Sequence, residues 1–215
     1  MEPINVFDYE ALAQARMEPS AWNYYQSGSD DEVTLRANRS AFERIRLRPR
    51  MLVDVSACDR STTVLGTPVS MPILIAPTAF HCLAHLEGEC ATAQGAGSAG
   101  TLMVASTSST RSLEEIAGEA GGPLWFQLYF HDRDSARKLV HRAETAGYRA
   151  LVITVDSPRW GHKERAMRSG FRLPSHLRKA NFADEDVPQA DVCVTWELLD
   201  WLRSLTSLPI VLKGI

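Results

Sequence analysis

Polar side chains stand at the C-terminal ends of five apolar runs in this sequence. The runs cover residues 72–77, 102–106, 124–130, 150–156 and 209–214. The polar residues at their ends include Thr78, Ser106, Gln127, Thr154 and Lys213. Because the C-terminal ends of parallel strands meet at one edge of a sheet, this set offers hydroxyl, carboxamide and ammonium groups to a polar cofactor. The alternative is that these side chains only cap strands and bond to loops, and the pattern alone does not separate the two.

The five runs are continuously apolar rather than alternating, which predicts a parallel sheet covered on both faces. Helical signals lie between them, at residues 87–99, 112–121, 132–147 and 196–205. The expected N-caps are Ser112, in a capping box with Glu115, then Asp132 and Thr195, and the expected inward-facing residues of the third helix are Leu139, Val140 and Ala143. This alternation predicts an α/β fold, either a β/α barrel or a doubly wound sheet. No G-x-G-x-x-G motif follows the first run, which weakens the case for a dinucleotide-binding domain.

The first 45 residues read as helices rather than strands. Helices are expected over residues 8–17, 20–26 and 30–45, and the expected buried face of the third is Val33, Leu35, Phe42 and Ile45. An extended stretch over residues 47–55 contains Pro49, which favours an edge strand.

Residues 158–191, between the fourth and fifth runs, are long for a plain connection and rich in basic residues. They are interpreted as a functional lid or flexible loop, and a solvated basic loop is the alternative. The sequence ends directly after the fifth run, whereas a β/α barrel needs eight strands. We therefore expect this chain to be part of a longer barrel.

The composition is that of a soluble globular protein: 215 residues, 45% hydrophobic and 23% charged, with a net charge of −3. This charge balance argues against nucleic-acid and membrane partners. The four cysteines form no C-x-x-C pair, and no export signal or membrane-spanning run is visible, which predicts a cytoplasmic protein. The nearest approach to a metal-ligand set is His81, Cys82, His85 and Glu89.

Eight motifs in order carry a family resemblance. They are YYQSG at 24–28, DEVTL at 31–35, LRPR at 47–50, MPILIAPTA at 71–79, AHLEGE at 84–89, WFQLY at 125–129, TVDSP at 154–158 and LKGI at 212–215. With them the sequence resembles the FMN-dependent L-2-hydroxy acid oxidases and dehydrogenases, of the glycolate oxidase and lactate oxidase type. The sequence of residues 80–85 is most similar to bacterial members of the lactate oxidase type.

The resemblance implies a TIM (β/α)8 barrel, of which about five of the eight strands are present here. It implies one FMN hydroxy acid dehydrogenase domain over residues 1–215, with a helical lead-in at 1–45 and a partial barrel at 46–215. The cofactor implied is FMN, with Pro77, Thr78 and Ala79 along the flavin ring. Hydrogen bonds to the flavin edge are implied for Ser106, Gln127 and Thr154.

Lys213 is implied to place a positive charge beside the flavin N1–C2=O region, where a cation raises the electron affinity of the ring. From its residue type alone, Lys213 also fits two other roles. One is a strand-end lysine paired with a carboxylate, and the other is a Schiff-base lysine of a barrel lyase.

The resemblance implies that Tyr24 and Tyr129 donate hydrogen bonds to the carboxylate and hydroxyl of the substrate, although both could be core residues. His162 and Lys163 stand where the family has two adjacent arginines, the second of which grips the substrate carboxylate. A lysine is a point charge rather than a planar fork, so we expect poorer orientation of a 2-hydroxy acid.

The histidine that removes the substrate proton, and the groups that hold the FMN phosphate, follow later strands in the family, beyond Ile215. None of the six histidines here stands in the matching motif, so no catalytic residue is assigned. Residues 81–89 match an ordinary helix start of the family, and no metal is implied.

The expected activity is oxidation of an L-2-hydroxy acid, of the lactate or glycolate type, to a 2-oxo acid, without turnover by this chain alone. The expected partners are this small-molecule substrate and further copies of the chain. The alternative is a non-catalytic fragment that self-associates or binds a partner through the open barrel edge.

Overall fold

The structure is a computed structural model that describes residues 2–156, 161–182 and 194–215. It divides into two compact units, residues 1–59 with 160–173, and residues 60–159 with 174–215. The first unit holds α1 (Asp8–Arg16), α2 (Pro19–Gln26), α3 (Val33–Glu43) and α7 (Glu164–Arg168). The second holds β1 (Thr62–Val64), β2 (Thr67–Val69), the 3-10 helix η1 (His81–Leu83), α4 (Gly88–Ser98), β3 (Met103–Ser106), α5 (Leu113–Glu119), β4 (Leu124–Leu128), α6 (Arg133–Thr145), β5 (Leu151–Thr154), the 3-10 helix η2 (Ala180–Phe182), α8 (Trp196–Leu205) and β6 (Ile210–Lys213). The predicted boundary between residues 45 and 46 stays a prediction.

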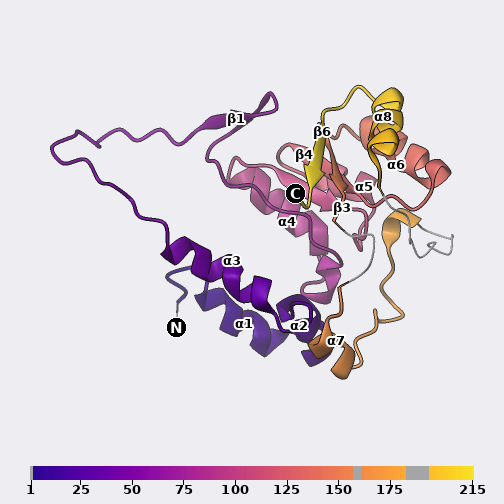
Figure 1. The fold of residues 1–215 in the computed structure, drawn as a ribbon, viewed down its shortest axis with the longest axis horizontal. Helices are drawn as coiled ribbons and strands as arrows, with labels where there is room; N and C mark the ends of the chain where they lie inside the picture. Colours follow the sequence, from indigo (N-terminus) through magenta and orange to yellow (C-terminus); the bar gives the residue numbers. More distant parts are fainter. Residues whose placement is uncertain (1, 157–160, 183–193) are drawn as a thin grey trace. The chain divides into compact units, whose positions relative to one another are not determined.

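The centre of the second unit is a parallel sheet, of which Figure 1 labels β3, β4 and β6. The order of its strands is β3-β4-β5-β6. Helices alternate with these strands along the chain, which confirms the α/β prediction. The expectation of five strands is wrong for the first run, which forms a single bridge between Ile75 and Met103. Pro72 and Pro77 bound this run, and because proline has no N–H to donate, pairing does not extend beyond its centre.

The two faces of the sheet bury different partners. Residues such as Phe126 and Ile153 pack against α4, α5, α6 and α8 in the larger apolar cluster. The alternate residues, such as Trp125 and Val152, pack with Val69 of the β1–β2 hairpin in a smaller cluster. Because side chains alternate along a strand, Gln127 shares the second face with Trp125. The polar residues at the strand ends thus continue the hairpin-covered face, away from the helices.

The predicted helix starts of the second unit are confirmed. Ser112 and Glu115 form a reciprocal capping box, with Glu115 N donating to Ser112 Oγ at 3.2 Å. Asp132 accepts two backbone N–H groups at the start of α6, and Thr195 accepts Leu198 N at the start of α8. The inward-facing residues predicted for α6 are buried: Leu139, Val140 and Ala143.

The helices of the first unit lie where the sequence predicts, but the expected buried face of α3 is wrong. The four residues of that face are exposed, at 38 to 73% of their surface: Val33, Leu35, Phe42 and Ile45. Helical periodicity identifies residues that share a face, but it does not supply a second layer to cover that face.

Two further expectations need correction. Residues 47–55 form no strand; the chain instead makes a hairpin from β1 and β2. Its turn residues Leu65 and Gly66 both have positive φ, at 46° and 74°, as two-residue hairpin turns of type I′ require. In the predicted lid, the described residues 161–182 contain α7 and η2, whereas 158–160 and 183–191 lie outside the described residues. No helix in the described ranges has both the length and the apolar character needed to cross a membrane.

Candidate ligand-binding edge of the parallel sheet

A row of hydrogen bonds crosses the C-terminal edge of the sheet. Strand register pairs Ser106 with Gln127, and Thr154 with Lys213. The Gln127 Oε1 atom accepts from Ser106 Oγ and from Thr107 N, both at 3.2 Å. On its other side, Gln127 Nε2 donates to Thr154 Oγ1 at 2.9 Å. Three strands therefore contribute side chains to one connected group.

The backbone N–H of Thr107 fixes the orientation of the Gln127 carboxamide. A backbone N–H can only donate, so the oxygen of the carboxamide must face Thr107 and the nitrogen must face Thr154. Thr154 Oγ1 accepts in this contact, which leaves its hydroxyl hydrogen for another acceptor. The second Nε2 hydrogen of Gln127 is left over in the same way. The row thus presents hydrogen-bond donors, although Ser106, Gln127 and Thr154 are themselves buried.

Lys213 adds a positive charge beside this row. Its register with Thr154 places the two side chains on the same face, and Lys213 is half-buried. Within the described ranges no carboxylate lies within ion-pair distance of Lys213, so the carboxylate-paired alternative gains no support there. The next residue, Gly214, has φ of +103°, and an added Cβ would lie 2.3 Å from Asp156 Cγ. Only glycine fits at the end of β6.

The predicted flavin-ring segment, residues 77–79, lies at the same end of the sheet. Ile75 pairs with β3 just before it, and Phe80 N donates to Ser108 O just after it, at 3.2 Å. Thr78 is exposed, whereas Pro77 and Ala79 are half-buried. The segment is therefore anchored at both ends beside the turn that follows β3.

Glu89 connects the residues after the 77–79 segment to the turn after β3. This carboxylate is fully buried, and its Oε1 accepts from His81 N at 3.0 Å and from Thr110 N at 2.8 Å. Its Oε2 accepts from Thr110 Oγ1 at 2.7 Å. Burial lowers the pKa of the adjacent His81 ring. Among the described residues, no group of three histidine, cysteine, aspartate or glutamate side chains is placed to hold a metal ion.

Tyr129 follows β4 and is tied to the same turn. Its backbone N donates to Thr107 Oγ1 at 3.0 Å. Burial, and secondarily the charge of Asp156, raises the pKa of the Tyr129 phenol above its ordinary value. The phenol therefore stays protonated at neutral pH and keeps its O–H as a donor.

In the first unit, the side chain of Lys163 contacts Tyr24. Lys163 Nζ donates to Tyr24 O at 3.1 Å and lies 4.9 Å from the centroid of the Tyr24 ring. Phe171 stacks on the same ring at 4.4 Å, and burial lowers the pKa of Lys163. The neighbouring His162 is exposed, and its Nδ1 lies 3.8 Å from Asp30 Oδ1. Two of the three predicted substrate residues are thus brought together, and Tyr129 belongs to the second unit.

Sequence reasoning missed two residues of this edge, Thr107 and Asn181. Thr107 contacts Gln127 through its N and through its Oγ1, and the polar run after β3 was a signal for it. Asn181 bonds to the same turn from a segment 74 residues away, and no local pattern pointed to it.

The chain matches the profile of the FMN-dependent dehydrogenases over residues 13–215, and it belongs to this family. The resemblance seen in the motifs is therefore confirmed, and the cofactor of the family is FMN. The class of fold and the polar edge of the sheet agree with this membership.

Curated relatives include an L-lactate oxidase of Nostoc sp., 51% identical over 99% of this chain and 64% of its own length. Another is glycolate oxidase 1 of Zea mays, 44% identical over 100% of this chain and 63% of its own length. Among solved structures, a mandelate oxidase variant with (S)-mandelic acid superposes with a TM-score of 0.92 at 40% identity, covering 100% of this chain and 62% of its own. A soluble mutant of the membrane-associated (S)-mandelate dehydrogenase from Pseudomonas putida gives 0.95 at 36% identity, covering 100% and 65%. The chain thus spans less than two thirds of the length of these relatives.

Proposed function

We propose that this chain binds FMN at the C-terminal edge of its parallel sheet. We further propose that it contributes to the oxidation of an L-2-hydroxy acid, of the lactate or glycolate type, to a 2-oxo acid. Family membership supports this, and the observation that carries it is the fixed carboxamide of Gln127 beside Thr154 and Lys213. When bound, FMN supplies the two-electron acceptor for this oxidation.

The donor chemistry of the row suits the flavin. The pyrimidine edge of an isoalloxazine ring carries carbonyl and ring-nitrogen acceptors, which match the donors left over on Gln127 and Thr154. Lys213 would add a positive charge at this edge, and such a charge favours electron uptake by the ring. The residues proposed along the ring are Pro77, Thr78 and Ala79, and the proposed contacts at its edge are Ser106, Gln127, Thr154 and Lys213. The proposal includes closure of the sheet into a (β/α)8 barrel, of which this chain forms part.

The substrate would meet groups of two kinds. The phenol of Tyr129, which stays protonated, would donate one hydrogen bond, and the hydroxyl of Tyr24 would donate another. Lys163 would attract the carboxylate as a single charge. No histidine of this sequence matches the family's proton-abstracting motif, so we propose that the chain alone does not turn over. The comparisons do not support the alternative of a non-catalytic binding fragment, and assembly into homo-oligomers stays a prediction.

Flavin titration tests the binding proposal. We expect the chain to quench FMN and riboflavin fluorescence with affinities that agree within about threefold, because the implied phosphate-holding groups lie outside this sequence. Lys213→Met should weaken binding and lower the reduction potential of the bound flavin. Lys138→Met, on the exposed side of α6, is the matched control and should change neither. Absence of quenching by the unaltered chain would overturn the proposal.

Anaerobic reduction tests the proposal about turnover. The flavin-loaded chain is mixed with L-lactate or glycolate, and the flavin absorbance is followed without oxygen. We expect no bleaching by either acid but complete bleaching by dithionite. Rapid bleaching by L-lactate would show that the chain carries its own base.

A further inference from the structure

The side chain of Asn181 forms hydrogen bonds with the backbone of the turn that follows β3 and with the start of α5. The residue is 5% exposed, and its Nδ2 donates to Ser106 O at 3.3 Å and to Thr107 O at 3.1 Å. Its Oδ1 accepts from Leu113 N at 2.9 Å, at the start of α5. One side chain therefore contacts three backbone groups that are 68 to 75 residues away in sequence. Ser106 O also accepts from Ser109 Oγ and N, at 2.6 and 3.2 Å, so Asn181 matters most for Thr107 O and Leu113 N. A buried backbone carbonyl or N–H without such a partner costs about 1–3 kcal/mol.

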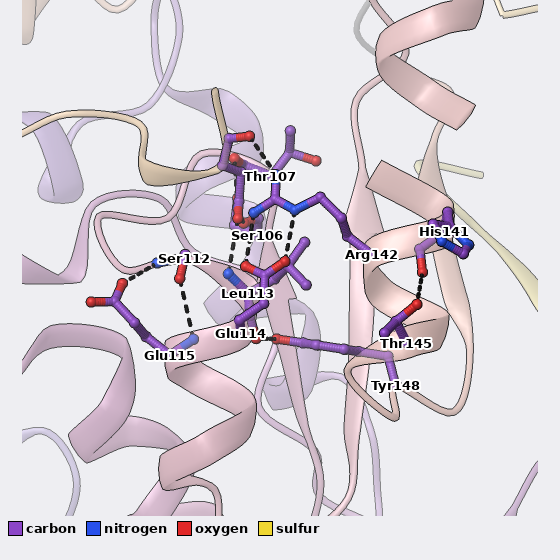
Figure 2. Close-up of polar contacts among 11 residues, drawn as sticks. Ser106, Thr107, Ser112, Leu113, Glu114, Glu115, His141, Arg142, Thr145 and Tyr148 are labelled. Carbon is purple, nitrogen blue, oxygen red and sulfur yellow. Dashed lines mark hydrogen bonds and ion pairs between the residues drawn. The ribbon is translucent and has the colours of Figure 1, made fainter. Parts of the chain in front are cut away.

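The backbone of Asn181 is itself held from both sides. Arg142 Nη1 donates to Asn181 O at 2.8 Å, and the same guanidinium bonds to the Glu114 carboxylate at 2.7 and 2.8 Å. Figure 2 shows this pairing of Arg142 with Glu114. Ala180 N donates to Ser109 O at 2.9 Å. The next residue, Phe182, is buried, and its ring meets that of His131 edge to face. The η2 turn thus presents the Asn181 side chain in one orientation.

The turn that Asn181 holds determines the orientation of Gln127. Ser106 Oγ and Thr107 N, which both donate to Gln127 Oε1, belong to the two residues whose carbonyls accept from Asn181. We infer that Asn181 is a positioning residue, which fixes the Ser106–Thr107 turn and thereby the donor edge of Gln127. The inference rests on the proposed function in one respect, that this edge meets FMN.

The chemistry of the position requires a carboxamide. The Nδ2 atom faces two carbonyl oxygens, those of Ser106 and Thr107, and Oδ1 faces the N–H of Leu113, so one end of the side chain must donate and the other must accept. An aspartate would retain the acceptor for Leu113 N, but it would place a carboxylate oxygen against the carbonyls of Ser106 and Thr107. Such a contact is repulsive in a buried site.

The experiment compares Asn181→Asp with Asn38→Asp in the full chain. Both variants replace a carboxamide by a carboxylate, but Asn38 lies exposed on α3. Nitrogen-15 NMR measures water exchange of the Gln127 side-chain NH2 group, and fluorescence titration measures FMN binding. We expect N181D to speed this exchange and to weaken FMN binding, each about tenfold, while N38D resembles the unaltered chain.

The readouts distinguish the two ideas. If the unaltered chain binds no FMN, the proposed function fails and the NH2 exchange alone decides whether Asn181 positions Gln127. Faster exchange confined to Gln127 and Thr107 supports the inference. Equal acceleration at a core amide such as Phe126, or no change at Gln127, overturns it. If N181D does not fold, Asn181→Ser adds no charge and is judged by the same criteria.

Discussion

Gln127 and Lys163 are both proposed to contact a ligand, but the chain holds them in different ways. Gln127 is 1% exposed at the end of β4, and three groups fix its carboxamide. Lys163 precedes α7, is half-buried, and is restrained by one hydrogen bond and by the face of the Tyr24 ring. Groups on neighbouring strands hold Gln127 at both ends of its carboxamide, whereas a single hydrogen bond and one ring hold the ammonium group of Lys163.

The difference follows from what each position requires. A carboxamide is useful as a donor only if its nitrogen is directed at the ligand, and fixed partners impose that direction. An ammonium group is a point charge with three equivalent donors, so its orientation matters less. We therefore expect substitutions at Gln127 to affect stability and ligand binding together, and substitutions at Lys163 to affect mainly ligand binding and the pH dependence of stability.

The largest effect is expected for Gln127→Leu. This change removes the side-chain partner of the Ser106 and Thr154 hydroxyls, whereas Thr107 N keeps its bond to the main-chain O of residue 127 at 3.0 Å. The free energy of unfolding should therefore fall by roughly 2–3 kcal/mol. Urea denaturation followed by circular dichroism measures it. The matched control is Gln94→Leu at an exposed position of α4, with a change within about 0.5 kcal/mol. Similar losses in both variants would show that the row contributes nothing particular.

A smaller effect is expected for Thr154→Val. The substitution keeps the shape but removes the acceptor for Gln127 Nε2, and should cost about 1–2 kcal/mol of unfolding free energy. Thr154→Ser keeps the hydroxyl and should lose less than the valine variant while retaining FMN binding. Urea midpoints and flavin titration check both variants. Valine and serine variants with equal FMN affinity would argue against a donor role for this hydroxyl.

Lys163 should impose a pH dependence on stability. Burial lowers its pKa in the folded chain, so between this lowered pKa and the ordinary value the unfolded chain binds more protons. The free energy of unfolding should therefore rise with pH across this window. Lys163→Met should flatten the rise, as measured by denaturation at several alkaline pH values. Because burial also lowers the pKa of Lys179, part of the slope should survive in K163M.

The smallest effect is expected for Lys163→Arg. A planar guanidinium can grip a carboxylate through two hydrogen bonds, so K163R should tighten L-lactate binding by about two- to fivefold without changing stability. Perturbation of the bound flavin spectrum by L-lactate measures this affinity. A weaker complex would indicate that the ring contact with Tyr24 already orients the ammonium group well.

The sequence alone predicted much of what is local. Continuous apolar runs identified β3, β4, β5 and β6, and capping residues such as Ser112 and Asp132 located the starts of their helices. These features are encoded within a few residues of one another. The same reasoning overestimated the run at 72–77 and missed the β1–β2 hairpin, because prolines and a left-handed turn override apolar patterning there.

Only the tertiary structure determined in which direction each polar side chain points and which of its atoms donates a hydrogen bond. The sequence placed Ser106, Gln127, Thr154 and Lys213 at strand ends, but only strand register put them on one face. Only the turn after β3 determined which end of the Gln127 carboxamide donates. Asn181 holds that turn from a distant segment. Hydrogen-bond direction depends on partners brought together by folding, and neighbours in sequence do not reveal it.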